Sequence, residues 1–174
     1  SRLLVQQGIY DEFVDAVAER FAALRVGSPE MDLDCGPLIS RRQQQRVRAF
    51  VDAAKAEGIP VLAQGVFADG ISPDGFFAAP TLFGAVPRDS QLACQEIFGP
   101  VLAAMSFTDE SDAIRLANAT EYGLVAGVWT ENGSRQSRVA HRIQSGQVFI
   151  NCYGAGGGVE LPFGGVKKSG YGRE

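Results

Sequence analysis

The chain has few of the side chains that build metal centres and hydrolytic triads. Its 174 residues include one histidine, His141, and three cysteines that are far apart and form no Cys-x-x-Cys pair, Cys35, Cys94 and Cys152. A zinc site needs about four ligands supplied close together, so no metal site is predicted. A Ser-His-Asp triad would have to use His141, which lies in a helix-like segment where a surface position is expected.

The sequence also lacks a long hydrophobic run and an excess of basic charge. No segment approaches the roughly 20 apolar residues that a membrane-spanning helix needs. Charged residues make up 21% of the chain and the formal net charge is −4. These values argue against nucleic acid or an anionic membrane as the main partner. Because three scattered thiols suit a reducing compartment, a cytoplasmic location is predicted.

The amino terminus carries no targeting signal. Ser1 to Gln7 lack the charged region and apolar stretch of a secretory signal peptide. The chain also begins without an initiator methionine, directly in a strand-like pattern, which leads us to expect a piece of a longer protein. Its length suits one domain, which we place over residues 1–174.

Phosphate-binding and thiol-activating patterns are missing as well. There is no Gly-x-x-x-x-Gly-Lys-Ser/Thr loop, and no Gly-x-Gly-x-x-Gly follows a strand in the first part of the chain. The glycines between positions 154 and 158 are followed by no amphipathic helix, so we interpret that loop as a flexible or close-packed wall. A reactive thiol needs a nearby cation or helix amino terminus to lower its pKa. None of the three cysteines has such a neighbour in sequence, and none is predicted to be a nucleophile.

Hydrophobic periodicity predicts alternating strands and helices, and therefore an α/β fold. Between residues 101 and 151 the order is strand, helix, strand, helix, strand, which is typical of right-handed parallel crossovers. Pro80 would confine its strand to an edge or to a strand start. Strands are expected at 3–7, 60–64, 79–83, 101–107, 124–130 and 147–151. Helices are expected from Phe13 to before Gly27, from an N-cap at Ser40 to Gly58, from Thr108 or Asp109 to Gly123, and through Val139 to Gly146.

The run Gln95-Glu96-Ile97-Phe98-Gly99-Pro100-Val101 is the most informative stretch. It places a carboxylate, Glu96, and an aromatic ring, Phe98, at the mouth of the predicted strand 101–107. A carboxylate can accept hydrogen bonds from a sugar diol, and a ring offers a face to a flat heterocycle. Ligand crevices of open α/β sheets lie at strand ends, so the position suits a nucleotide cofactor. The alternative is that Glu96 is an exposed turn residue and Phe98 belongs to the core.

A second run near the end of the chain, residues 162–174, favours the cofactor interpretation. Together with several segments in the same order, the two runs resemble the aldehyde dehydrogenase superfamily. The matching segments are Ser1-Arg2-Leu3-Leu4-Val5, Gly36-Pro37-Leu38-Ile39-Ser40, Phe77 to Thr81, Glu96 to Val101, Asn118 to Leu124, Gly146 to Asn151 and Pro162 to Glu174.

The resemblance implies a three-layer α/β/α fold with a mostly parallel sheet, like part of that family's catalytic domain. It implies oxidation of an aldehyde to a carboxylic acid with NAD or NADP through a cysteine thioester. Glu96 would hold the nicotinamide ribose hydroxyls and Phe98 would pack by the nicotinamide ring. Asn151 and Phe163 would line the aldehyde pocket, and the glycine-rich loop would leave that pocket roomy or mobile.

The same resemblance implies that essential parts lie outside residues 1–174. The family's nucleophilic cysteine and general-base glutamate precede the position of Ser1, so no catalytic residue is expected in this chain. The family's chain also continues beyond Glu174 into a strand used in oligomer contacts, and the full-length protein is expected to be a homo-oligomer. The isolated chain is predicted to be inactive.

Two other interpretations remain open at this point. One is a natural short, non-catalytic domain of the same fold that oligomerises or docks onto a partner. The other is a related reductive dehydrogenase that acts on an activated acyl group.

Overall fold

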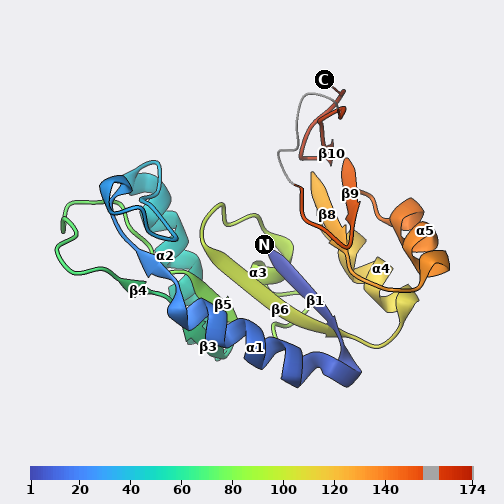
Figure 1. Cartoon of the computed structure of the whole chain (residues 1–174), viewed down its shortest axis with the longest axis horizontal. Coiled ribbons are helices and arrows are strands. Elements are labelled where there is room, and N and C mark those ends of the chain that lie inside the picture. The colour runs from blue at the N-terminus through green and yellow to red at the C-terminus, as the bar shows by residue number, and fades with distance from the viewer. Residues whose placement is uncertain (155–160, 174) are drawn as a thin grey trace. The chain divides into compact units, whose positions relative to one another are not determined.

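The computed structural model describes residues 1–154 and 161–173, which belong to two compact units, Ser1–Phe107 and Thr108–Glu174 (Figure 1). Each unit has its own strands and helices. The single domain expected from the chain length stays a prediction. Most of the predicted glycine-rich loop lies outside the described residues, and so does the expectation of a roomy pocket beside it.

The first unit begins with a strand and a long helix and ends with a seven-residue strand. Its elements are β1 (Arg2–Gln6), α1 (Tyr10–Ala23), β2 (Arg25–Val26), α2 (Arg41–Ala56), β3 (Val61–Gln64), β4 (Val66–Phe67), β5 (Thr81–Phe83), α3 (Gln91–Cys94) and β6 (Val101–Phe107), with short 3-10 helices at Gln7–Ile9 and Pro29–Met31. The second unit contains α4 (Glu110–Asn118), β7 (Tyr122–Gly123), β8 (Val125–Val128), α5 (Gly133–Arg142), β9 (Gln147–Ile150) and β10 (Val166–Lys167).

A four-stranded sheet in the order β1-β6-β5-β3 forms the centre of the first unit. Strand β6 is parallel to both β1 and β5, and β3 is antiparallel to β5. Strands β2 and β4 form a separate parallel pair. The strand expected at 79–83 is therefore an interior strand of the sheet. Pro80 is tolerated because it lies immediately before Thr81, at the strand start that the sequence allowed.

Helices cover both faces of this sheet, which gives the predicted α/β/α layering (Figure 1). Alternate residues of β6 point to opposite faces: Val101, Ala103 and Met105 pack with α2 and α3, and Ala104 packs with α1. Because both faces are covered, β6 is apolar except for Ser106, as parallel strands usually are. In this arrangement the residues that immediately precede β6 pack against α2.

The helix boundaries follow the capping residues in the sequence. The Ser40 hydroxyl accepts a hydrogen bond from the Gln43 amide at 3.2 Å, and Asp109 accepts one from the Asp112 amide at 2.9 Å. Gly58 follows α2 with a φ of 77°, the left-handed conformation expected of a helix stop. These parts of the prediction are confirmed.

In the second unit, β8 and β9 are parallel, and α5 packs on both strands. The predicted series of crossovers from 101 to 151 is wrong in its first step, because β6 pairs with β1 and β5 whereas β8 pairs with β9. Periodicity identifies a strand but does not name its partner. Gly123 and Gly146 are not helix stops: α4 ends at Asn118 and α5 at Arg142.

None of the helices in the described part of the chain is long and apolar enough to cross a membrane.

Candidate functional site

The turn before β6, residues 95–100, carries the two predicted cofactor residues, and we call it the Glu96 turn. It lies at the amino end of β6, next to the start of β5, where the Thr81 amide donates to the Pro100 carbonyl at 2.8 Å. Ligand crevices in doubly wound sheets lie at the carboxyl ends of strands, so that rule does not describe this position. The sequence places these residues just before the strand, and the structure confirms that they precede β6; a cofactor site there stays a prediction.

Within the Glu96 turn, side chains alternate between the core and solvent. Ile97 is 4% exposed and packs in the core with α2, whereas Glu96 is exposed and Phe98 is 72% exposed. Phe98 is therefore not a core residue, whereas Glu96 is an exposed turn residue, as the alternative interpretation expected. It adopts a φ of 58°, a left-handed conformation that a bulky residue rarely takes and that the surroundings must support. The turn thus exposes the Glu96 carboxylate and the Phe98 ring. The buried Ile97 side chain between them anchors the turn in the core.

Helix α2 supplies that anchorage through two side chains. The Gln43 side-chain amide donates to the carbonyls of Ile97 at 2.9 Å and Phe98 at 2.8 Å. The Arg46 guanidinium donates to the carbonyl of Glu96 at 2.8 Å. The turn also passes close to the helix, because a Cβ placed on Gly99 would collide with Val47. Sequence reasoning did not identify Gln43 or Arg46, since nothing in the local pattern says which distant carbonyls a polar helix residue will bind.

Asn151 ties together the ends of β8 and β9 in the second unit. Its side-chain oxygen accepts from the Thr130 amide at 2.9 Å, its side-chain nitrogen donates to the Thr130 carbonyl at 3.0 Å, and its backbone amide donates to Val128. Its φ of 53° is one that asparagine tolerates better than most residues. Both ends of the amide are used to fix the chain as it leaves β9. These two side-chain bonds use one amide hydrogen and one acceptor site of the oxygen, so the exposed side chain keeps one donor and one acceptor for other partners.

Phe163 lines a hollow of about 270 Å³ in the second unit and is 42% exposed. Asn151 is not among the residues that line this hollow. The other lining residues flank β10 or, in the case of Leu124, immediately precede β8: Leu124, Gly164, Gly165, Ser169, Gly170, Tyr171, Gly172 and Arg173. Seven of the nine lining residues lie within residues 164–173, so the shape of the hollow depends on how that segment is held.

Residues 164–173 form a clasp around the loop that follows α4, and we call this segment the terminal clasp. The Lys167 ammonium donates to the carbonyls of Asn118 at 2.9 Å and Thr120 at 2.8 Å, at the carboxyl end of α4. A cation is favoured there because the last carbonyls of a helix carry partial negative charge. The Ser169 hydroxyl accepts from the Gly123 amide at 3.0 Å, and Arg173 donates to the Gly165 carbonyl at 2.8 Å. Much of the closing motif therefore builds structure.

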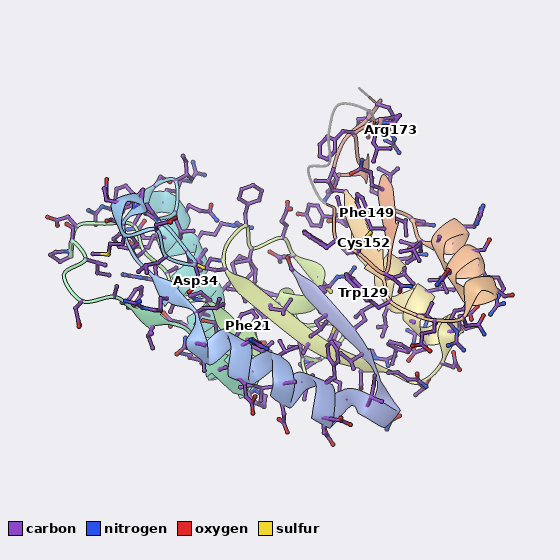
Figure 2. The ribbon with its side chains drawn as sticks, viewed as in Figure 1. Phe21, Asp34, Trp129, Phe149, Cys152 and Arg173 are labelled. Atoms are coloured by element: carbon purple, nitrogen blue, oxygen red, sulfur yellow. The ribbon has the colours of Figure 1, made fainter. Side chains whose placement is uncertain are left out.

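The cysteines and the histidine lie where no nucleophile is expected. Partial burial, and then the Asp34 carboxylate, raise the pKa of Cys35. The Cys94 thiol donates to the Arg88 carbonyl at 3.5 Å, and Cys152 is exposed just after β9 (Figure 2). The exposed His141 ring contacts the carbonyl of Ser137 within α5. Within residues 1–154 and 161–173, no three metal-binding side chains gather in one group.

Comparison with known proteins assigns the family. Residues 1–174 match the sequence model described as "Aldehyde dehydrogenase family". The chain belongs to the aldehyde dehydrogenase family. Betaine aldehyde dehydrogenase of Rhizobium leguminosarum bv. trifolii (strain WSM2304) is 41% identical over 175 residues, covering 100% of this chain and 36% of that protein.

Solved aldehyde dehydrogenase structures share the fold. A Burkholderia cenocepacia structure assigned to the aldehyde dehydrogenases matches with a TM-score of 0.97 and 55% identity, covering 99% of this chain and 36% of the other. The NAD+ complex of aldehyde dehydrogenase from Bacillus cereus matches with a TM-score of 0.91 and 38% identity, covering 100% and 35%. The chain thus spans slightly more than a third of the length of the relatives that it matches.

The terminal clasp gives a stability prediction. Lys167→Met in the full-length protein removes two charge-assisted hydrogen bonds, so we expect a loss of about 1.5 kcal/mol in unfolding free energy, measured by urea titration. The matched control is Lys168→Met, because the Lys168 ammonium pairs with Glu121 at 2.6 Å on the exposed surface. Exposed pairs contribute little, so Lys168→Met should leave the midpoint nearly unchanged. Equal effects of the two substitutions would contradict the clasp role of Lys167.

Proposed function

We propose that this chain is part of an NAD(P)-dependent aldehyde dehydrogenase that oxidises an aldehyde to a carboxylic acid through a cysteine thioester. The nucleophile and the general base would come from parts of the protein outside residues 1–174. NAD or NADP, when bound, would take the hydride released from the aldehyde carbon. The family membership and the solved NAD+ complex of a 38% identical relative support this proposal.

The contribution of this chain would be to hold the nicotinamide end of the cofactor. Glu96 would accept hydrogen bonds from the ribose hydroxyls, and Phe98 would lie against the nicotinamide ring. The observation that carries this proposal is the Glu96 turn, which presents an exposed carboxylate and a 72% exposed ring while Ile97, between them, is buried. A fixed turn of this kind suits a ligand that must be placed accurately for hydride transfer.

We further propose that Asn151 and Phe163 shape the aldehyde pocket, Asn151 by fixing the chain after β9 and Phe163 through its exposed ring. The substrate would be a small-molecule aldehyde. The full-length protein would be a cytoplasmic homo-oligomer, in keeping with three scattered cysteines and a net charge of −4.

The experiment that tests the cofactor role is Glu96→Gln in the full-length protein. The substitution keeps the shape of the side chain and removes the charge from its hydrogen bonds to the ribose. A hydrogen bond to a charged group contributes about 1.5–3 kcal/mol, so kcat/KM for the cofactor should fall roughly 10- to 100-fold. Steady-state kinetics with NAD and with NADP, at saturating aldehyde, measure the effect.

Glu57→Gln is the matched control, because Glu57 is exposed in the same unit, just after α2, and the substitution makes the same change in net charge. It should leave cofactor kinetics unchanged. If Glu96→Gln is as harmless as Glu57→Gln, the proposed contact with the ribose is wrong. Measuring the reaction with an activated acyl compound and reduced cofactor in parallel would show whether reduction is the favoured direction.

A further inference from the structure

We propose that Gln43 is the residue that positions the Glu96 turn for cofactor binding, acting through the backbone and not by touching the substrate. The proposal rests on the proposed function of Glu96 and Phe98. It adds a residue, Gln43, that supports their turn although it lies 54 residues from Ile97 in sequence. The one side-chain amide of Gln43 donates to two successive carbonyls, those of Ile97 and Phe98.

The geometry fits a device that sets backbone orientation. A glutamine amide has two hydrogens, so it can satisfy two carbonyls at once. Each carbonyl fixes the plane of its peptide group, and these two planes set the direction in which the Phe98 side chain leaves the turn. Phe98 holds a φ of 58°, which the free chain disfavours. The two hydrogen bonds therefore act on the residue whose conformation most needs support.

The part of α2 that carries Gln43 is held in place by core packing and by an N-cap hydrogen bond. Its neighbours on α2 include Val47 at 2% exposure and Phe50 at 9%, both in the core with Ile97. The Ser40 hydroxyl also accepts from the Gln43 backbone amide, so the first turn of the helix is fixed where the side chain begins. Arg46, one turn further along, holds the Glu96 carbonyl at 2.8 Å. The carbonyls of residues 96, 97 and 98 are thus all bound by one helix.

Three consecutive glutamines in α2 lie in different surroundings, which provides matched controls. Gln43 binds the Glu96 turn. Gln44 is 5% exposed and its amide donates to the Phe77 carbonyl at 2.8 Å and the Gly75 carbonyl at 3.3 Å, so it holds a different loop. Gln45 is exposed. The same substitution at each position separates cofactor positioning from general stability.

The test is Gln43→Met, Gln44→Met and Gln45→Met in the full-length protein. Methionine keeps the length of the side chain and its helix propensity but removes the donors. Gln43→Met should raise the cofactor KM about tenfold and increase the deuterium isotope effect on aldehyde oxidation, because misplacement by about 1 Å slows hydride transfer. Gln44→Met should lower the melting temperature and leave both kinetic values unchanged at a temperature where the protein is folded. Gln45→Met should change neither.

Gln43→Lys provides the rescue, since an ammonium group can donate to both carbonyls. It should recover part of the cofactor affinity that Gln43→Met loses. A cofactor KM and isotope effect within twofold of wild type for Gln43→Met would overturn the proposal, as would an equal kinetic defect in Gln44→Met. If Glu96→Gln impairs the enzyme and Gln43→Met does not, only the positioning role fails. If Glu96→Gln is harmless, the proposed function itself fails.

Discussion

No oxidation of an aldehyde is expected from the polypeptide of residues 1–174 when it is supplied with NAD or NADP. The family resemblance would place the nucleophile and the general base outside these residues, and Cys35 is poorly suited to replace the nucleophile. Partial burial, and then the Asp34 carboxylate, raise the pKa of the Cys35 thiol. A thiol that is not converted to thiolate attacks carbonyls weakly. Formation of reduced nicotinamide, followed by absorbance, measures the result.

The control for this prediction is the full-length protein under the same conditions, which should turn over. Turnover by residues 1–174 that disappears in Cys94→Ala or in Cys152→Ala would contradict the account. Such a result would mean that a thiol in this chain serves as the nucleophile. The proposal that the nucleophile lies outside residues 1–174 would then have to be abandoned.

Gly146→Ala is expected to cause the largest loss of stability in the second unit. A Cβ at Gly146 would overlap the carbonyl oxygen of Gly164, and it would also approach the Cα of Gly165. Both are backbone groups of the terminal clasp, so neither can rotate away as a side chain would. Overpacking of this kind typically costs up to about 3 kcal/mol. Urea denaturation of the full-length protein, monitored by amide hydrogen exchange of residues in β8, β9 and the terminal clasp, measures the loss.

Gly133→Ala is the matched control for that substitution. Gly133 is the first residue of α5, and no atom outside its immediate neighbours lies within 4 Å of the position that a Cβ would take. Because alanine favours helix more than glycine does, this change should be neutral or slightly stabilising. If Gly146→Ala also proved neutral, the close approach of the terminal clasp to Gly146 would be wrong.

Local signals in the sequence predicted individual elements well. Strand β6 has the predicted bounds, because seven successive residues are mostly apolar and are buried on both faces. The starts of α2 and α4 follow the side chains of Ser40 and Asp109. Such features depend on a few neighbouring residues, and a sequence displays those directly.

Contacts between distant segments were not predictable in the same way. The separation of β8 and β9 from the sheet that contains β6 depends on strand pairing, which no single segment encodes. The spacing Ser40-x-x-Gln43 is typical of a capping box, in which the glutamine would reach back to the start of its own helix. The structure shows its amide bound instead to carbonyls more than 50 residues away.

The residue types of the candidate site could be predicted from the sequence. The backbone conformations and hydrogen bonds that hold these residues were harder to predict. Glu96 and Phe98 were identified from the Glu-Ile-Phe-Gly-Pro-Val run; the structure shows both side chains exposed, and their contact with a cofactor stays a prediction. The left-handed φ values of Phe98, Asn151 and Lys167 carry no marker in the sequence, since these residues usually adopt other conformations. The two hydrogen bonds between the Asn151 side-chain amide and Thr130 likewise appear only once β8 and β9 are paired.

The most direct measurement is a crystal structure of the full-length protein with its nicotinamide cofactor bound. Our account predicts that the Glu96 carboxylate accepts hydrogen bonds from the ribose hydroxyls next to the nicotinamide, with the Phe98 ring against the heterocycle. A cofactor whose nicotinamide end binds elsewhere, with Glu96 still surrounded by water, would contradict it.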